Sequence, residues 1–179
     1  MDFTVLPGLI DMHTHLSDWG QTSNVAEPLL HSSEDIALVG AKNARDTLNA
    51  GFTSVRDVGT FRAFGDVSLR NAIEGGYIEG PRMAVAGAYI TVPGGGGEVT
   101  GMAPDVEIPA IMRMGVAAGP EEAKAKARML FQRGADFLKV IATGAVLAAG
   151  TEPGAPEMTE AEIRAAVDEA ARYKSYVTA

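Results

Sequence analysis

Pro7-Gly8-Leu9-Ile10-Asp11-Met12-His13-Thr14-His15 is the stretch of sequence that most constrains the fold. The apolar run from Val5 to Met12 predicts a buried strand, and two histidines stand at its end. Because side chains i and i+2 of a strand point to the same face, both imidazoles can converge on one metal ion. The simpler alternative is two histidines in a turn with no metal role. Two of the chain's three histidines lie here, which favours a metal site.

Strand and helix signals alternate along the rest of the chain. Helix-start signals with an acidic first turn follow Ser32 and Thr159, and Pro120 suits the first turn of another helix. The expected strands are Val5–Met12, Phe52–Val58, Arg82–Ile90, Ala135–Ala142 and the start of a fifth at Ser175–Ala179, with helices beginning near residues 34, 66, 120 and 160. Such alternation predicts an α/β protein with parallel strands and right-handed crossovers. An open doubly wound sheet and part of a (β/α)8 barrel both fit.

Helical periodicity predicts which side chains of the helices face the core. The expected apolar faces are Ala37, Ala41, Ala44 and Leu48 in the first helix, Ala123, Ala127, Leu130 and Phe131 in the helix after Pro120, and Ile163, Ala166, Val167 and Ala170 in the last. No linker divides the sequence, so residues 1–179 are expected to form a single domain.

Lys139 lies between Leu138 and Val140 in an otherwise apolar strand. Burying an ammonium group is costly, so such a lysine is usually paired, neutralised or modified. A neutral amine can react with carbon dioxide to form a carbamate, which would be an anionic oxygen ligand for metal ions. The simpler alternative is a lysine at a strand edge with its ammonium group in water.

Other polar residues near strand ends carry weaker signals. Asp57, Tyr89 and Thr143 could support metal ligands or line a pocket, and Arg56-Asp57 could form an ion pair or brace the site. The run Gly94-Gly95-Gly96-Gly97 could bring backbone amides to a substrate anion. Since no phosphate-loop lysine and hydroxyl follow that run, a flexible loop is the favoured interpretation.

Composition excludes several classes of function. A formal net charge of -8 argues against a general nucleic-acid binder and against docking on anionic membranes. Without cysteine there are neither disulfides nor thiolate metal sites, so any metal must be held by histidine, carboxylate or a modified side chain. No apolar run approaches the ~20 residues of a membrane span, and the N-terminus lacks a signal-peptide layout. A cytoplasmic location is therefore expected.

Three segments resemble the amidohydrolase superfamily. The runs Leu6–Leu16, Ala50–Asp57 and Phe137–Gly144 resemble its first, second and fourth barrel strands, the last of which carries a carboxylated lysine in that family. Gly150–Pro156 and the helix after it are similar to the branch of Xaa-Pro dipeptidases, arginine carboxypeptidases and imidazolonepropionase-like proteins. The resemblance covers nearly the whole chain. It implies a partial (β/α)8 barrel of roughly four βα units plus the start of strand five.

The resemblance also implies a chemistry. His13 and His15 would bind one of two divalent metal ions, expected to be zinc, and carboxylated Lys139 would bridge the two. A metal-bridged hydroxide would attack the carbonyl of an amide C–N bond in a dipeptide, an acylated amino acid or a cyclic amide. The partner would therefore be a small-molecule amide.

The sequence lacks several of the site residues that the family pattern contains. The histidines of strands five and six and the aspartate of strand eight have no counterpart here, so the 179-residue chain is expected to be inactive alone. A non-catalytic half-barrel, a metal-binding remnant and an open α/β binding module are the alternatives. A half-barrel exposes sheet edges, which predicts self-association into homo-oligomers.

Overall fold

The computed structural model describes residues 4–20 and 24–179. Its strands are short and run parallel, in two sheets whose order follows the chain. The first sheet contains β1 (Leu9–Thr14), β2 (Phe52–Asp57) and β3 (Arg82–Val85), and the second contains β4 (Tyr89–Ile90), β5 (Leu138–Val140) and β6 (Val177–Thr178). The amide of Asp136 donates to the carbonyl of Val85 at 2.8 Å and links the two. The expected parallel α/β arrangement is confirmed, with strand boundaries shorter than predicted for 135–142 and 175–179.

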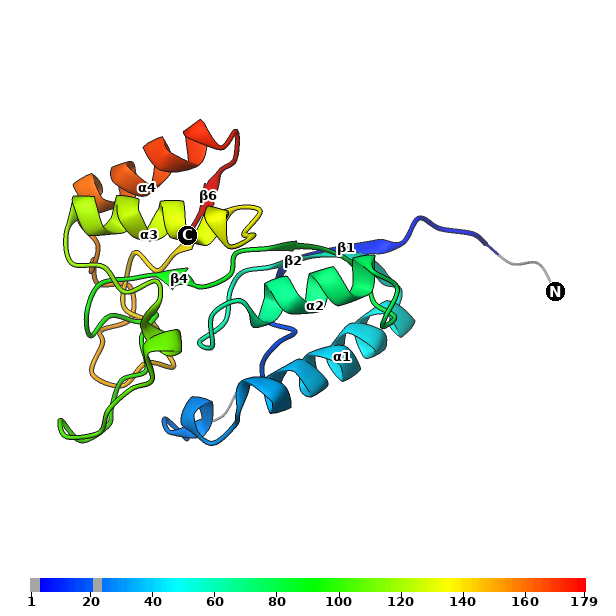
Figure 1. The fold of residues 1–179 in the computed structure, drawn as a ribbon, viewed down its shortest axis with the longest axis horizontal. Helices are drawn as coiled ribbons and strands as arrows, with labels where there is room; N and C mark the ends of the chain where they lie inside the picture. Colours follow the sequence, from blue (N-terminus) through cyan, green and yellow to red (C-terminus); the bar gives the residue numbers. More distant parts are fainter. Residues whose placement is uncertain (1–3, 21–23) are drawn as a thin grey trace.

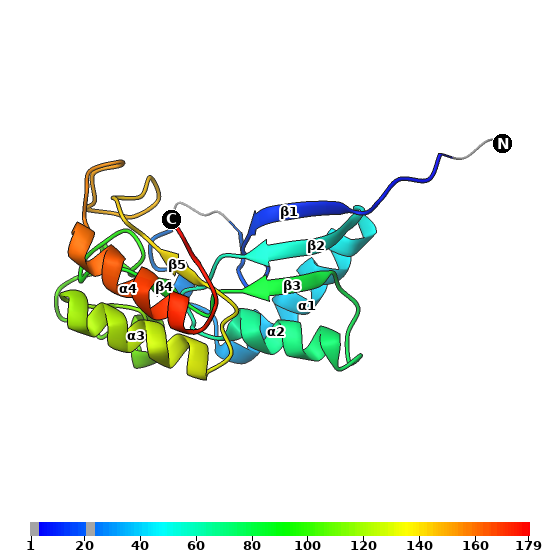
Figure 2. The ribbon, with the colours of Figure 1, turned by 90° about the horizontal axis from the view of Figure 1, so that it is seen from above.

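In the described part of the chain, four α-helices cover the sheets from outside (Figures 1 and 2). Their bounds are α1 (Ser33–Asn49), α2 (Gly65–Glu74), α3 (Pro120–Gln132) and α4 (Glu160–Arg172), and two short 3-10 turns are η1 (Glu27–Leu29) and η2 (Ala110–Arg113). The sequence predicted all four α-helices within a few residues. The capping boxes begun by Ser32 and Thr159 are both formed, so each cap side chain accepts an amide of the first turn.

The strand expected over 82–90 is broken in two, which the sequence did not predict. Gly87, at φ +80°, turns the chain between β3 and β4. The amide of Gly87 donates to the buried carboxylate of Asp66 at 2.7 Å, and the amide of Ala86 donates to the carbonyl of Asp57. Both acceptors lie more than 20 residues earlier in the chain, so local patterning carries no sign of this break.

The predicted helix faces are partly wrong. In α1 the prediction is confirmed at Ala44, but Ala37 is exposed, and Ile36 and Gly40 are buried in addition. In α4 Val167 is exposed and Glu169 is buried, since the Glu169 carboxylate is paired with Arg128 of α3. The prediction for α3 is confirmed at Ala123, Ala127 and Leu130.

The core lies between the sheets and the helices. Its most deeply buried apolar side chains include Val85, Ile90, Leu130, Leu138 and Val140. Along the whole described chain, no helix is both long and apolar enough to cross a membrane.

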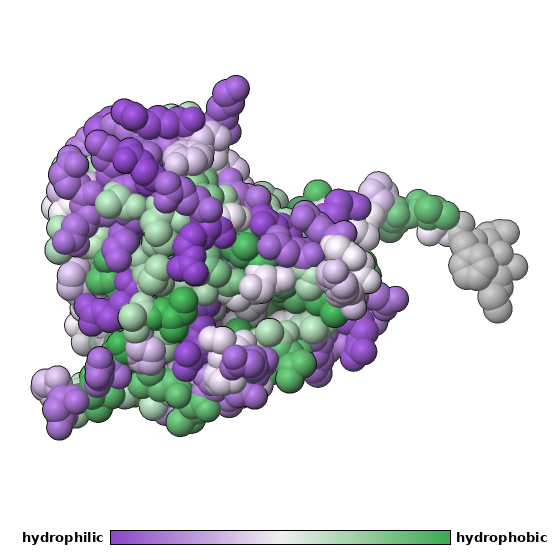
Figure 3. All heavy atoms as spheres, viewed as in Figure 1, coloured by the Kyte–Doolittle hydropathy of each residue, from purple (hydrophilic) through white to green (hydrophobic). Residues whose placement is uncertain are grey.

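β1 departs from its predicted burial. It begins at Leu9 rather than Val5, and it is largely exposed, with Ile10 at 64% of its full accessibility. Among the described residues β1 pairs only with β2, so its other edge stays open. The apolar segment before it stands away from the body of the molecule (Figure 3).

Candidate metal-binding site

The candidate residues lie in or beside four of the parallel strands. His13 and His15 lie at the end of β1, Asp57 ends β2, Tyr89 begins β4 and Lys139 is the central residue of β5. In parallel α/β folds the carboxyl ends of the strands form the edge where ligands bind, because the loops that follow them converge there.

The two histidines of β1 lie side by side. Their ring centroids are 5.3 Å apart and the planes meet at 70°. An irregular register between Asp11 and Thr14 accompanies this arrangement. Partial burial lowers the pKa of His13, and the neighbouring charges of His15, Lys139 and Arg56 lower it further. A neutral imidazole is the form that binds a metal ion, so this environment suits a ligand.

His15 makes a polar contact through Nδ1. That atom lies 2.8 Å from the carbonyl oxygen of Gly59 and 3.2 Å from the hydroxyl of Tyr89. The Tyr89 hydroxyl also donates to Gly59 at 3.1 Å. Burial raises the pKa of Tyr89 well above its ordinary value, so this phenol stays protonated. Sequence reasoning selected Tyr89 by position but did not find Gly59, whose carbonyl is a main-chain group.

Lys139 is buried, with 7% of its accessibility left, between β4 and β6. The alternative of a lysine at a strand edge does not fit, because β5 is paired on both sides. Burial lowers the pKa of Lys139, and the positive charge of Arg56 lowers it further. Both effects favour the neutral amine, which is the form that reacts with carbon dioxide.

Asp57 is fully buried at the end of β2. Its Oδ2 accepts hydrogen bonds from the amide of Leu16 at 2.6 Å and from the hydroxyl of Thr14 at 3.4 Å. Asp57 therefore binds both neighbours of His15 in the chain. Burial, and then the charge of Asp66, raise the pKa of Asp57 well above its ordinary value.

Arg56 points the other way from Asp57. Its Nε donates to the carbonyl of Met12 at 2.8 Å, and its guanidinium lies 5.7 Å from the centre of the Phe137 ring. Arg56-Asp57 was expected either to form an ion pair or to brace the site. Bracing fits these contacts, because each side chain supports β1 from a different face.

The last two predicted features are Thr143 and the glycine run 94–97. Thr143 is exposed and pairs through its backbone with Pro156. All four amides of the run 94–97 donate within the chain: to the carboxylate of Glu98, the carbonyl of Val92, the carboxylate of Glu157 and the hydroxyl of Thr91. These amides are therefore occupied rather than presented to a substrate anion, and the loop is fixed by its own hydrogen bonds.

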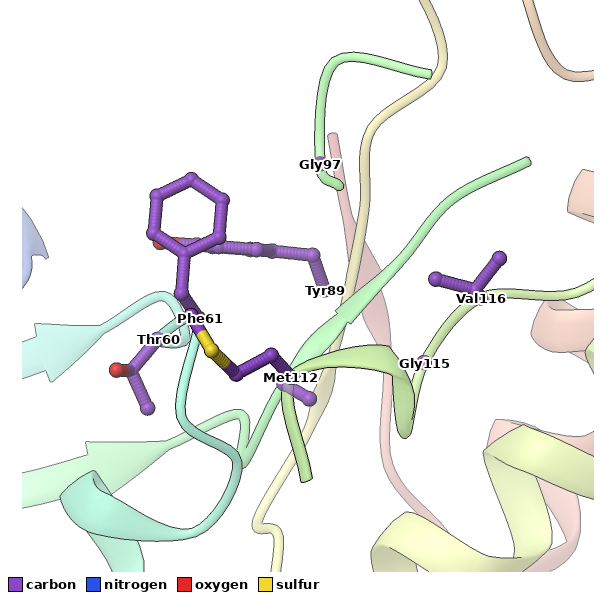
Figure 4. Close-up of a pocket in the computed structure, with 8 residues that line it drawn as sticks. Thr60, Phe61, Tyr89, Gly97, Met112, Gly115 and Val116 are labelled. Carbon is purple, nitrogen blue, oxygen red and sulfur yellow. The ribbon is translucent and has the colours of Figure 1, made fainter. Parts of the chain in front are cut away.

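A small cavity adjoins Tyr89. Figure 4 shows Phe61 and Met112 beside the Tyr89 ring, and Thr60, Gly97 and Gly115 complete most of the lining. The Phe61 and Tyr89 rings meet edge to face, 5.4 Å apart. The cavity, of about 10 Å³, is too small for a peptide-sized molecule.

Within residues 4–20 and 24–179, no three His, Cys, Asp or Glu side chains form a group able to hold a metal ion. The candidate donors are two imidazoles and one lysine, and lysine becomes an oxygen ligand only after carboxylation. The donors fit part of a metal site, since zinc binds imidazole and anionic oxygen and a structural site usually has four ligands.

The family model for amidohydrolases matches residues 4–179. The chain belongs to the amidohydrolase family. Amidohydrolases generally use divalent metal ions, in line with the imidazole pair on β1. The ochratoxinase of Aspergillus niger is 28% identical over 191 residues, an alignment that covers 98% of this chain and 38% of that protein.

Solved structures agree with the family assignment. A Xaa-Pro dipeptidase with methionine bound in its active site is 35% identical, with a TM-score of 0.84, over 96% of this chain and 42% of that one. A prolidase in complex with N-methylphosphonate-L-proline is 31% identical, with a TM-score of 0.83 and the same two coverages. The chain thus spans about two fifths of the length of these relatives. The expected fold, a partial (β/α)8 barrel, is confirmed.

Proposed function

We propose that this chain forms the first part of the metal centre of a hydrolase that acts on amide C–N bonds. The observation that carries the proposal is that His13 and His15 lie side by side at the end of β1, while Lys139 is buried in β5 of the second sheet and its charge acts on His13. The related Xaa-Pro dipeptidase and prolidase support a dipeptide or a similar small amide as the substrate class.

His13 and His15 would hold one divalent ion, for which zinc is the proposed identity, and a carbamate on Lys139 would bridge to a second. Bound metal ions would supply Lewis acidity to polarise the amide carbonyl and acidify water. The chain's own residues prepare this centre. Asp57 and Gly59 fix the β1 end, and burial lowers the pKa of Lys139, which favours the amine form that can be carboxylated.

Zinc stoichiometry tests the metal centre. We expect the wild type to retain zinc after gel filtration, measured by plasma mass spectrometry, and the double variant His13→Ala/His15→Ala to lose it. His31→Ala is the matched control, because His31 contacts Glu27 and Trp19 on another part of the molecule. Equal zinc in the wild type and the double variant would instead support an α/β binding module without a metal role.

The carbamate has its own test. With 13C-labelled bicarbonate, a carbamate carbon signal should arise in the wild type and vanish in Lys139→Arg. Lys42→Arg, at an exposed position on α1, should keep the signal. A spectrum without the signal in the zinc-loaded wild type would contradict carboxylation.

A panel of dipeptides and acylated amino acids, supplied with zinc and bicarbonate, tests catalysis. Three protein ligands leave two metal ions short of donors, so we expect metal binding without turnover from the 179 residues alone. Turnover would show that these residues suffice. Metal binding without activity in any longer form of the protein would favour the metal-binding remnant.

A further inference from the structure

Tyr89 makes a contact with the metal-site region that the proposed chemistry leaves unexplained. Its hydroxyl lies at the end of a buried ring and approaches two atoms, Nδ1 of His15 at 3.2 Å and the carbonyl oxygen of Gly59 at 3.1 Å. The same carbonyl lies 2.8 Å from Nδ1 of His15. The three groups therefore form a closed triangle of polar contacts.

The protons in this triangle can be assigned from its chemistry. A carbonyl oxygen only accepts hydrogen bonds, so Nδ1 of His15 must carry its proton in order to bond to Gly59. The Tyr89 hydroxyl also donates to Gly59, which leaves the phenol oxygen as an acceptor facing the Nδ1–H group. In the neutral ring the second nitrogen, Nε2, then keeps its lone pair free for a metal ion.

Packing holds the tyrosine in this position. Its ring meets Phe61 edge to face at 5.4 Å and His15 at 5.9 Å. Gly59 has φ +108°, and a Cβ on it would lie 3.1 Å from the Tyr89 ring. The glycine thus provides both the turn that aims its carbonyl at His15 and the space that the tyrosine fills.

We propose that Tyr89 is a positioning residue that, with the Gly59 carbonyl, holds His15 in its Nδ1–H tautomer and presents Nε2 to the metal ion. This inference rests on the proposed function for its purpose, but the tautomer itself is a property of the metal-free chain. Groups that orient a ligating histidine in this way typically change metal affinity by about 10- to 100-fold when they are removed.

Long-range 1H–15N correlation spectra of the metal-free chain, labelled at histidine, test the inference directly. His15 should show the Nδ1–H pattern in the wild type. Tyr89→Phe keeps the Gly59 carbonyl but removes the second acceptor at Nδ1, so it should raise the share of the Nε2–H tautomer and weaken zinc binding by about tenfold. Tyr173→Phe removes the same atom from a ring that stacks on Phe131, and it should match the wild type in both measurements.

Each outcome decides the question. An Nε2–H pattern in the wild type, or an unchanged tautomer in Tyr89→Phe, would overturn the inference. If the wild type binds no zinc, the proposed function fails while the tautomer comparison still stands. If Tyr89→Phe does not fold, the wild-type Tyr89 hydroxyl proton is decisive: it should exchange slowly and show cross-relaxation with the His15 ring, and rapid exchange would overturn the inference.

Discussion

Replacing the buried carboxyl group of Asp66 should flatten the dependence of stability on pH. Asp66 is fully buried, and this burial raises its pKa to about 6 from an ordinary 3.8. At about 1.4 kcal/mol per pKa unit, the difference corresponds to ~3 kcal/mol between the two protonation states. The magnitude is large against a typical total stability of about 5–15 kcal/mol.

The sign follows from which state holds the proton more tightly. Between pH 4 and 6 the folded chain keeps the Asp66 proton while the unfolded chain has released it, so the free energy of unfolding falls as pH rises. Below that window both states are protonated, and above it the penalty is constant. Asp57, whose pKa is raised in part by the charge of Asp66, adds a slope of the same sign.

Asp66→Asn removes this titration and also the charge that acts on Asp57. The two oxygens of Asp66 accept the amides of Val67 and Gly87, and an asparagine oxygen can replace only one of them. The lost acceptor costs about 1–3 kcal/mol at every pH. The variant should therefore be less stable than the wild type near pH 4.5 and close to it at pH 7.

Urea unfolding of the metal-free chain, followed by circular dichroism between pH 4.5 and 7.5, measures this difference. Asp168→Asn, at an exposed position of α4, is the control and should run parallel to the wild type. Parallel profiles for Asp66→Asn and the wild type would refute the assignment of the pH dependence to this buried carboxyl group.

Three further changes test the packing. Gly59→Ala should cost about 1–2 kcal/mol in urea unfolding and weaken zinc binding, because its φ is +108° and the new Cβ would press on Tyr89; unchanged zinc affinity would contradict the role given to this turn. Leu130→Ala, in the core, should lower the free energy of unfolding by about 2–5 kcal/mol. Leu147→Ala, at an exposed site, should change it by no more than about 0.5 kcal/mol. Similar losses in the two variants would mean that the core is misplaced. The proposed self-association should appear in sedimentation velocity and be reduced by Ile10→Lys on the open edge of β1, whereas a monodisperse wild-type monomer would contradict it.

The parts of the fold that the sequence predicted are those determined by neighbouring residues. The capping boxes at Ser32 and Thr159 need only a hydroxyl and a carboxylate three residues apart, so α1 and α4 begin where predicted. The break between β3 and β4 depends on the approach of Asp66 to Gly87, which is a tertiary contact. The burial of Glu169 likewise depends on Arg128 of another helix. In both cases the partner lies far away in the sequence, so a local pattern cannot predict the contact.

The candidate site shows the same difference between local sequence patterns and tertiary contacts. Residue type and spacing selected the histidine pair, whereas Lys139 was selected as a ligand through the family resemblance, and it is buried. The groups that orient them were missed or only guessed by position, since the Gly59 carbonyl is a main-chain atom and Tyr89 acts from another strand. A sequence pattern of ligands therefore predicts which atoms could bind a metal ion, but not how those atoms are aimed.

The orientation of the histidines depends more on the end of β2 than on β1 itself. Asp57 accepts the amide of Leu16 and the hydroxyl of Thr14, Val58 donates its amide to the carbonyl of Thr14, and the Gly59 carbonyl contacts the His15 ring. Because β1 is exposed and, among the described residues, paired on one side only, its own packing does little to fix the histidines. The three consecutive residues 57–59 can fix them, and so changes there should alter metal affinity even though none of the three side chains is a proposed ligand.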